Sequence, residues 1–330
     1  MSEPAQALLE TQGSRLGRRP LNPVLIAFII AVLLFVVGEL VSPGFAAYSQ
    51  IINVLRVSSF LGIIAAGQTL VILSGGEGVD LSVGAIVTFG AIIASRVIDG
   101  QDSMVLWGLA QALAAGLALG AVNGVLIAYL KVPPLIMTLG MASVVKGLIL
   151  VYTRGQPSGR AAPIMVRLGS QETIFGIPGI LWIWLLLTIV LTLVLRQTTF
   201  GRSVYALGAN RRTAYLSGIA VQRMVVAVYS LSGFLSALGG FFFLGYTESV
   251  FLNLGDRYVL PSVAAVVVGG TSLAGGAGGY VGTVVGSIVL TVLQSVLVTL
   301  RMEESGRQIV YGLVLLALLA AYGRQYRLRQ

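Results

Sequence analysis

The sequence predicts an all-α, polytopic helical membrane protein with about ten transmembrane helices. Of its 330 residues, 56% are hydrophobic and only 10% are charged, whereas ordinary globular proteins carry roughly 25% charged residues. Several apolar segments exceed the length of about 18 residues that is needed to cross a hydrocarbon core of about 30 Å. A bilayer accepts only helices or closed barrels, and these segments lack the alternation of barrel strands. The chain is therefore expected to be helical.

The apolar segments give the order of the spans. They lie at roughly 22–41, 51–73, 80–98, 104–130, 134–153, 179–196, 222–245, 259–277, 279–300 and 307–323. Residues 1–20 then form a cytoplasmic tail, 21–323 the transmembrane domain and 324–330 a second cytoplasmic tail. The first span is long and lacks an A-x-A-like cleavage signal, so we expect it to be retained. This arrangement leaves twelve basic residues inside and eight outside, the bias that cytoplasmic loops usually carry.

Composition excludes several functions. The chain has no cysteine and no histidine, which excludes thiolate chemistry, imidazole metal sites and histidine-based acid–base catalysis. We expect no metal site and no bound cofactor. The net charge of +9 comes from basic residues at span ends, so membrane topology explains it better than nucleic-acid binding. Neither Lys131 nor Lys146 lies in a G-x-x-x-x-G-K-[ST] loop, so the chain is not expected to hydrolyse ATP by that mechanism.

A polar interruption at 198–221, TTFGRSVYALGANRRTAYLSGIAV, is predicted to be a cytoplasmic loop that folds into a short helix. It carries arginines and no acidic residue. Ala209, Thr213, Leu216 and Ala220 would fall on one helical face by their i, i+3, i+4 spacing. Such a helix could dock into a groove of another protein or lie on anionic lipid. The residues alone leave both possibilities open.

A weak internal repeat relates residues 71–92 to residues 266–289. In both segments an apolar run enters Gly-Gly and a polar, glycine-rich bend before another apolar helix. Glycine-broken helices at corresponding places in two halves of a membrane protein indicate a translocation path. Asp80 lies in the first bend, where a carboxylate could line a path or cap the following helix. The candidate path or helix-break residues are Gln68, Gly75, Gly76, Asp80, Ser82, Asn123, Thr138, Gly269, Gly270 and Thr271.

The loop from 154 to 177 is the longest exposed segment predicted on the outer face. Its arginines, Arg154, Arg160 and Arg167, could meet acidic residues of another protein by electrostatic steering. A solvated loop without such a partner is the alternative.

Four stretches together resemble the membrane-spanning permease of bacterial ABC importers for monosaccharides, the group that serves ribose, xylose, arabinose, rhamnose and the autoinducer-2 signal. They are GGEGVDLSVGA (75–85), VPPLIMTLGMASVVKGL (132–148), TFGRSVYALGANRRTAYLSGI (199–219) and VVVGGTSLAGGAGGYVGT (266–283). Each is a weak glycine-rich pattern, but their order and spacing are specific, and the resemblance covers about residues 24–323.

The resemblance implies a pore subunit in the bacterial inner membrane, with both termini cytoplasmic, rather than an enzyme. ATP and Mg would be bound by a separate ABC ATP-binding subunit, and a periplasmic substrate-binding protein would deliver the solute. A second permease copy or paralogue would complete the pore. The coupling helix of the family would lie near Asn210–Gly218. The implied coupling residues are Gly201, Arg202, Gly208, Asn210, Arg211, Arg212, Leu216, Ser217 and Gly218.

The sequence departs from this family in two places. Arg211 and Arg212 follow Asn210 where the family usually has an acidic residue, which predicts a more acidic groove on the ATPase. The Gly-Gly-hydrophobe-Asp-Leu-Ser bend is longer here by Glu77 and Gly78, which weakens any role given to Asp80 by analogy. A branched-chain amino acid permease and an ion-gradient-driven transporter remain as alternatives. An intramembrane enzyme would have only carboxylates for its chemistry.

Overall fold

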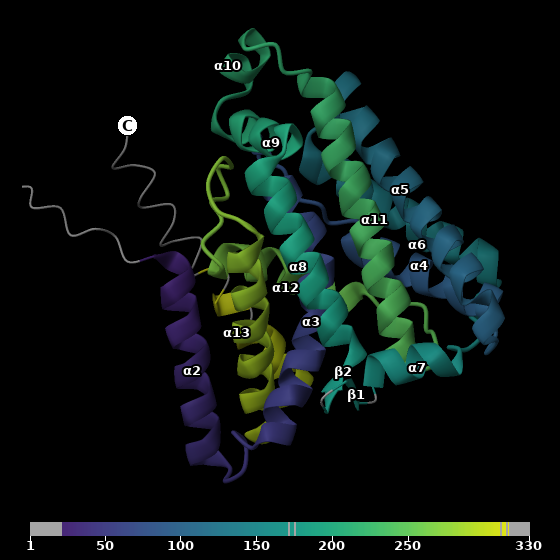
Figure 1. Cartoon of the computed structure of the whole chain (residues 1–330). Coiled ribbons are helices and arrows are strands. Elements are labelled where there is room, and N and C mark those ends of the chain that lie inside the picture. Colours follow the sequence, from purple (N-terminus) through teal and green to yellow (C-terminus); the bar gives the residue numbers. More distant parts are fainter. Residues whose placement is uncertain (1–21, 171, 175, 311, 315, 317–330) are drawn as a thin grey trace, which may run out of the picture.

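The computed structural model describes residues 22–170, 172–174, 176–310, 312–314 and 316, which are mostly helical (Figure 1). In chain order the helices are α2 Pro23–Val41, α3 Tyr48–Leu73, α4 Val83–Ile98, α5 Val105–Tyr129, α6 Pro134–Thr153, α7 Pro163–Ser170, α8 Gly179–Gln197, α9 Thr199–Ala209, α10 Arg211–Leu216, α11 Val221–Thr247, α12 Val259–Val268 and α13 Tyr280–Thr299. Residues 304–310 are helical as well. Single 3-10 turns at Asp102–Met104 and Asp256–Tyr258 precede α5 and α12, and β1 Glu172–Ile174 pairs with β2 Ile177–Pro178 in an antiparallel hairpin.

The prediction of a polytopic helical membrane protein is confirmed. Among the described residues, seven helices are long and apolar enough to cross a membrane, namely α2, α3, α5 with the turn before it, α6, α8, α11 and α13. Helix α4 has 16 residues and α12 has 10. Much of the predicted span 307–323 lies outside the described residues. The predicted count of about ten spans is therefore not confirmed.

The predicted span 259–277 is wrong in its second half. Helix α12 ends at Val268, and residues 269–279 form an irregular loop. Gly270, Gly275 and Gly276 have φ values of +87°, +88° and +71°, which a right-handed helix cannot accommodate. Small residues counted as apolar, so the hydropathy pattern did not reveal this break.

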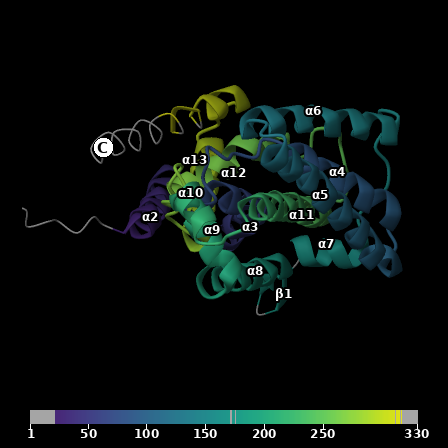
Figure 2. The ribbon, with the colours of Figure 1, turned by 90° about the horizontal axis from the view of Figure 1, so that it is seen from above.

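Helix α11 lies at the centre of the bundle and packs against α3, α4 and α5 (Figure 2). Its contact with α5 depends on glycines spaced four residues apart, Gly116, Gly120 and Gly124. A Cβ at these positions would lie 2.4, 2.2 and 2.6 Å from backbone atoms of α11. Small residues let membrane helices approach this closely, so that packing can hold them together.

The peripheral helices expose apolar side chains. Only 17% of the apolar window of α2 and 22% of that of α6 is buried, against 83% for α3. Unbroken apolar helices with their backbone hydrogen bonds satisfied internally suit contact with lipid.

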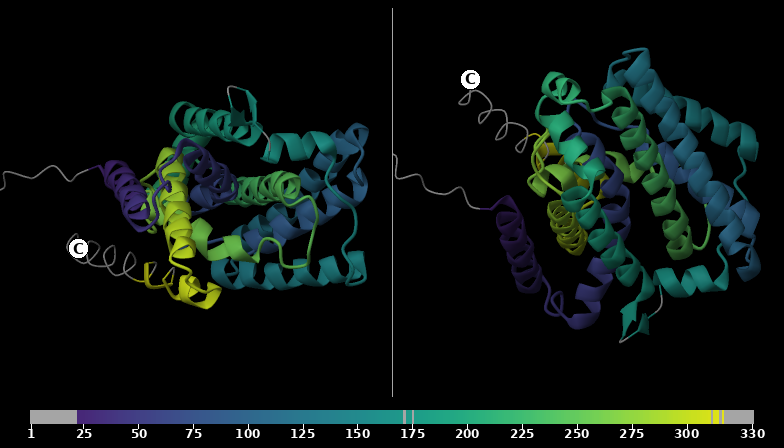
Figure 3. Two further views of the ribbon diagram at one scale, coloured as in Figure 1. Left: turned by 90° about the horizontal axis from the view of Figure 1, so that it is seen from below. Right: turned by 45° about the horizontal axis from the view of Figure 1, so that its top comes forward.

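The two ends of the bundle differ. Helices α9 and α10 lie at one end, whereas α7 and the β1–β2 hairpin lie at the opposite end (Figures 1 and 3). The segment 154–177, predicted as an outer loop, thus contains a short helix and part of the hairpin. The loops 74–82 and 269–279 lie against α9, so both helix breaks face the same end of the molecule.

Candidate functional site

The α9–α10 segment consists of two short helices rather than the single helix predicted. The Thr198 hydroxyl accepts the Gly201 N–H at 3.2 Å, which caps α9, and the Asn210 side-chain oxygen accepts the Thr213 N–H at 3.0 Å, which caps α10. Gly218 follows α10 with a φ of +84°. Asparagine before a helix and glycine after it are favoured caps, so these two residues bound α10.

The single apolar face predicted for this segment is wrong. Asn210 is extended and separates the two helices, so Ala209 belongs to α9, and Ala220 lies beyond the end of α10. Within α10, Ala214 is buried, whereas Tyr215 and Leu216 are 68% and 76% exposed. Helix α10 therefore packs against the bundle through Ala214 and exposes the two large side chains of Tyr215 and Leu216.

The exposed side of this segment is also cationic. Arg202 and Arg212 are exposed, and neither forms an ion pair with a residue that the structure describes. Apolar groups surrounded by unpaired cations at one end of a membrane bundle form a surface suited to an acidic partner.

Helix α9 packs on the bundle through two glycines. A Cβ at Gly201 would lie 2.2 Å from the Leu195 carbonyl oxygen. A Cβ at Gly208 would lie 2.0 Å from the Leu73 carbonyl oxygen and 2.3 Å from the Gly276 nitrogen. Gly208 therefore contacts both helix breaks, the one after α3 and the one after α12.

The two helix breaks also contact one another. The Gly276 N–H donates to the Leu73 carbonyl at 3.0 Å, and a Cβ at Gly275 would lie 2.5 Å from the Cα of Gly75. Gly75, Gly208, Gly275 and Gly276 thus bring three backbone segments together, and we call this set the glycine junction. The two halves of the predicted repeat meet here, at α9.

Two further side chains link the α9–α10 segment to these loops. The Tyr205 hydroxyl donates to the Gly278 carbonyl at 2.9 Å, and burial raises the pKa of this phenol, which keeps its proton. Arg211 reaches the other loop, with its guanidinium 3.5 Å from the Gly75 carbonyl oxygen. A Cβ at Gly76 would lie 2.4 Å from that guanidinium. Arg211 therefore has a contact inside the chain, whereas Arg212 has none that the structure describes.

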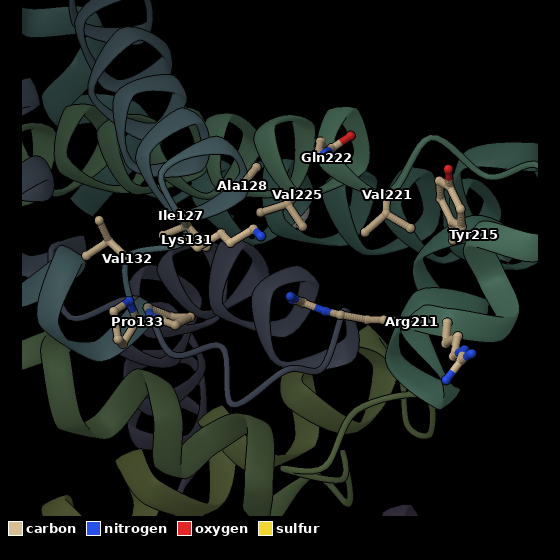
Figure 4. Close-up of a pocket in the computed structure, with 12 residues that line it drawn as sticks. Ile127, Ala128, Lys131, Val132, Pro133, Arg211, Tyr215, Val221, Gln222 and Val225 are labelled. Carbon is tan, nitrogen blue, oxygen red and sulfur yellow. The ribbon is translucent and has the colours of Figure 1, made fainter.

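A cavity of about 490 Å³ separates α10 from the turn between α5 and α6. Figure 4 shows Lys131 of that turn and Arg211 extending into it from opposite sides. Its walls are largely apolar and include Val221 and Val225 of α11. The cavity adds Lys131 to the cationic surface at this end of the molecule.

Asp80 is fully buried at the core of the first helix break. Its carboxylate accepts the N–H and the hydroxyl of Ser82 at 3.0 and 2.5 Å, and the Ser232 hydroxyl of α11 at 2.7 Å. Ser82, not Asp80, is the N-cap residue of α4, and its side chain makes no capping bond. Asp80 thus accepts a free backbone N–H at the start of α4, as the helix-cap hypothesis expected, although Ser82 is the residue that immediately precedes the helix. Asp80 also ties the loop before α4 to α11.

Other predicted residues of the first half join this cluster. The Asn123 amide of α5 donates to the Ser82 hydroxyl at 2.9 Å, and the Thr138 hydroxyl of α6 donates to the Val79 carbonyl at 3.2 Å. The Gln68 side-chain amide, in the orientation that satisfies both of its ends, pairs with the backbone N–H and C=O of Asp80 at 3.2 Å each. Buried polar side chains from four helices, α3, α5, α6 and α11, thus hold the loop of the first helix break in place.

The predicted residues of the second half lie elsewhere. A Cβ at Gly269 would lie 2.2 Å from the backbone of Gly282 in α13. Gly270 faces Pro23 of α2, and the Thr271 hydroxyl accepts the Gly279 N–H at 3.3 Å. These residues shape their own loop and reach the first half only through the glycine junction.

The three arginines predicted on the outer face, Arg154, Arg160 and Arg167, lie at the end opposite to α10. Arg154 ends α6 in a left-handed conformation, Arg160 pairs with Ser249 in an isolated β-bridge, and Arg167 lies in α7. All three are exposed, and within the described part of the chain none forms an ion pair. Their guanidinium groups are free to meet another protein.

Sequence reasoning missed the residues that complete these contacts. Ser232 is one of several serines on α11, and nothing in its spacing relates it to Asp80, 152 residues away. Gly275 and Gly276 lie in the glycine-rich bend that the repeat predicts, but nothing in that pattern indicates which segments they contact. The ion pair between Lys146 and Asp256, at 2.9 Å, joins a residue predicted inside a span to one predicted outside. A charge in an apolar helix indicates a partner, but not which one.

The fold and the junction define a polytopic membrane protein in which an exposed, basic helical segment contacts both interrupted-helix loops. A family model described as "Branched-chain amino acid transport system / permease component" matches residues 50–319. The chain belongs to this family of membrane permeases.

Curated relatives cover nearly the whole chain. It is 35% identical to the ribose import permease protein RbsC of Haemophilus influenzae, over 94% of this chain and 96% of that protein. Identity to RbsC of Bacillus subtilis is 36%, over 93% and 95%. The autoinducer 2 import system permease protein LsrC of Escherichia coli is 32% identical, over 92% of this chain and 87% of that protein. No solved structure matches.

Proposed function

We propose that this chain is the transmembrane permease subunit of an ATP-driven importer, and that it translocates a monosaccharide or a related polar solute. The observation that carries the proposal is the contact of Gly208 with both helix breaks. Through that contact, a force applied to the α9–α10 segment would reach both interrupted helices. Family membership and the names of the relatives support the importer class.

The energy would come from another chain. This sequence contains no G-x-x-x-x-G-K-[ST] loop, so ATP and Mg would be bound by a separate ABC ATP-binding subunit. That subunit would bind α10 in an acidic groove. The exposed side chains of Tyr215 and Leu216 would supply the apolar contact, and Arg212 would supply the charge. Arg202 and Ser217 would flank the contact, Gly201 would hold α9 against α8, and Asn210 and Gly218 would fix the ends of the docked helix.

Two further partners belong to the proposal. A periplasmic substrate-binding protein would dock near Arg154, Arg160 and Arg167, which are exposed at the end opposite to α10. A second permease copy or paralogue would complete the pore, while lipid covers the remaining apolar faces.

A branched-chain amino acid permease is the second candidate, because the family model carries that description. The relatives that match over nearly the whole chain are a ribose and an autoinducer 2 permease, which favours a sugar. A competition assay that compares D-ribose with L-leucine in uptake separates the two.

The decisive experiment is uptake of labelled D-ribose into proteoliposomes that hold this chain with its ATPase and the cognate binding protein. We expect uptake that requires ATP and is insensitive to an uncoupler. Uptake that proceeds without ATP, or that the uncoupler abolishes, would overturn the proposal in favour of an ion-gradient-driven transporter.

The role of α10 is tested by charge reversal. Arg211→Glu combined with Arg212→Glu should lower ATP-driven uptake by about tenfold or more, as rim charges set partner recognition. Arg212→Glu alone separates partner contact from the internal contact of Arg211 with Gly75. Arg223→Glu, an exposed arginine on α11 outside the segment, is the matched control. Full transport by the Arg212→Glu variant would exclude Arg212 from the docking contact.

Orientation is tested with single cysteines, since the chain has none. A membrane-impermeant maleimide applied to intact cells should label Gln101→Cys, in the turn before α5. It should label Ser217→Cys, at the end of α10, only after the cells are permeabilised. The reverse pattern would place α10 outside the cell.

A further inference from the structure

A second and larger cavity, of about 900 Å³, lies between α3, α12, α13 and residues 304–310 and 312. The first turns of α3 and the last turns of α13 line it, and these ends lie opposite to α9 and α10 (Figure 1). Its volume falls within the range of about 300–1,000 Å³ that is usual for small-molecule sites. None of the residues predicted from the sequence as path residues lines it.

The polar wall of this cavity consists mainly of neutral amides and hydroxyls. Gln50, Gln294 and Gln308 line it together with Thr291 and Ser295. The amides of Gln50 and Gln294 have no hydrogen-bond partner among the described residues. An amide offers two donors and an acceptor with two lone pairs, so these groups can bind a solute that is rich in hydroxyls.

Asn53 adds a free donor beside them. Its side-chain oxygen accepts a hydrogen bond from the Arg56 guanidinium at 2.5 Å. That contact fixes the orientation of the amide and leaves its NH₂ group for the cavity. The pairing with Arg56 therefore presents an oriented donor to a ligand.

Most charges at the rim are already compensated. The Asp256 carboxylate pairs with Lys146 at 2.9 Å, Glu304 pairs with Arg307, and the Arg257 guanidinium lies 5.9 Å from the centre of the Phe243 ring. A zwitterion needs a carboxylate and a cation that are free to pair with it, because an unpaired buried charge is costly. The wall is suited to a neutral polar ligand.

Apolar side chains complete the lining, among them Val57, Leu61, Leu260 and Pro261, together with Tyr246. A pocket of this kind can bind the C–H groups of a ligand while a few polar groups orient its hydroxyls.

We propose that this cavity binds a neutral, polyhydroxylated solute of monosaccharide size as it enters from the outer face, and that Gln50, Asn53 and Gln294 are its recognition residues. This inference rests on the proposed function and names the substrate class and the place of binding in the same transport path.

The test uses the cysteine-free chain, purified at full length in lipid nanodiscs without an ATPase. Val298→Cys, which lines the cavity but is not one of the three recognition residues, is labelled with a maleimide, and the labelling rate is measured with and without millimolar D-ribose, with L-leucine as the second probe. Gln101→Cys, exposed in an outer turn away from the cavity, is the matched control. We expect D-ribose to slow labelling of the Val298→Cys variant several-fold, whereas L-leucine should not, and neither compound should affect the control.

Equal labelling rates with and without D-ribose, or equal protection by L-leucine, would overturn the inference. If the Val298→Cys variant does not fold, Val57→Cys supplies the same measurement from α3. Because no ATPase is present, the outcome is independent of energy coupling. Protection by D-ribose combined with ATP-independent uptake would overturn the proposed function but would still support binding at this cavity.

Discussion

At the scale of single residues, Asp80 shows how a buried carboxylate is held without a cation. Ser82 supplies two donors and Ser232 a third, and hydrogen bonds to the charged form compensate part of the cost of burial. The same bonds make the residue structural, since they join the loop before α4 to the central helix. Asp80 thus fixes one helix break to α11.

Replacing Asp80 with alanine should destabilise the protein. The Ser82 N–H and two serine hydroxyls would lose their acceptor, and each buried group left unsatisfied costs about 1–3 kcal/mol. We expect the apparent melting temperature in detergent to fall by several degrees for Asp80→Ala and by less for Asp80→Asn, which keeps one acceptor oxygen. Glu77→Ala, at an exposed position of the same loop, is the control. An Asp80→Ala variant as stable as the wild type would contradict this account.

Gly208 gives a second prediction at this scale. Alanine usually stabilises a helix by about 1 kcal/mol relative to glycine, but here its methyl group would lie 2.0 Å from a backbone carbonyl oxygen. Overpacking costs about 1–3 kcal/mol, so Gly208→Ala should lower the apparent melting temperature and displace α9. Gly140→Ala on α6, where no neighbouring atom lies within 4 Å, should be neutral or stabilising. Equal melting temperatures for the two variants would show that the glycine junction has room for a methyl group at Gly208.

At the scale of elements, α10 has only six residues, so it has little helical stability of its own. Asn210→Ala removes the N-cap and should cost about 0.5–2 kcal/mol, which is enough to fray this helix. ATP-driven uptake should fall several-fold, while the apparent melting temperature of the bundle changes little because α10 lies at its surface. Asn210→Ser, which keeps a capping oxygen, should restore uptake. A fully active Asn210→Ala variant would show that docking does not require a preformed α10.

The elements also show what the sequence could predict. Apolar length sufficed for the long helices, because lipid requires it, and the Asn210 and Gly218 caps lie at the two ends predicted for α10. Apolar length alone failed at 269–279, where glycines count as apolar but several adopt positive φ values, whereas the internal repeat did predict a glycine-rich bend there. The break at Asn210 was missed because a helical periodicity continues through an extended residue.

The site was predictable only in part, for a related reason. Gln68, Asp80, Ser82, Asn123 and Thr138 stand out as polar residues in apolar segments, and the fold does bring them together. The contact between the two glycine loops depends on three-dimensional packing that no local pattern encodes. Gln50, Asn53 and Gln294, which line the larger cavity, are ordinary polar residues in the sequence. They come together only because α3 and α13 lie side by side.

At the scale of the whole molecule, charge separates the two ends. No acidic residue occurs between 198 and 221, and Arg202, Arg211, Arg212 and Lys131 share the α10 end. Complex formation with an acidic ATPase groove would therefore be steered by charge. Exposed charges interact over a Debye length of about 10 Å at 0.1 M salt but only about 3 Å at 1 M.

The dissociation constant of the permease–ATPase complex should therefore rise by about tenfold or more as salt increases from about 0.1 M to about 1 M. Titration of labelled ATPase onto the permease in nanodiscs measures it. Arg212→Glu should both weaken binding and flatten the salt dependence, because one attractive charge becomes repulsive. Arg167→Glu, an exposed arginine at the opposite end, should leave both unchanged. A complex whose affinity ignores salt would be held by Tyr215 and Leu216 alone, and the cations at this end would then serve only to keep it on the inner side of the membrane.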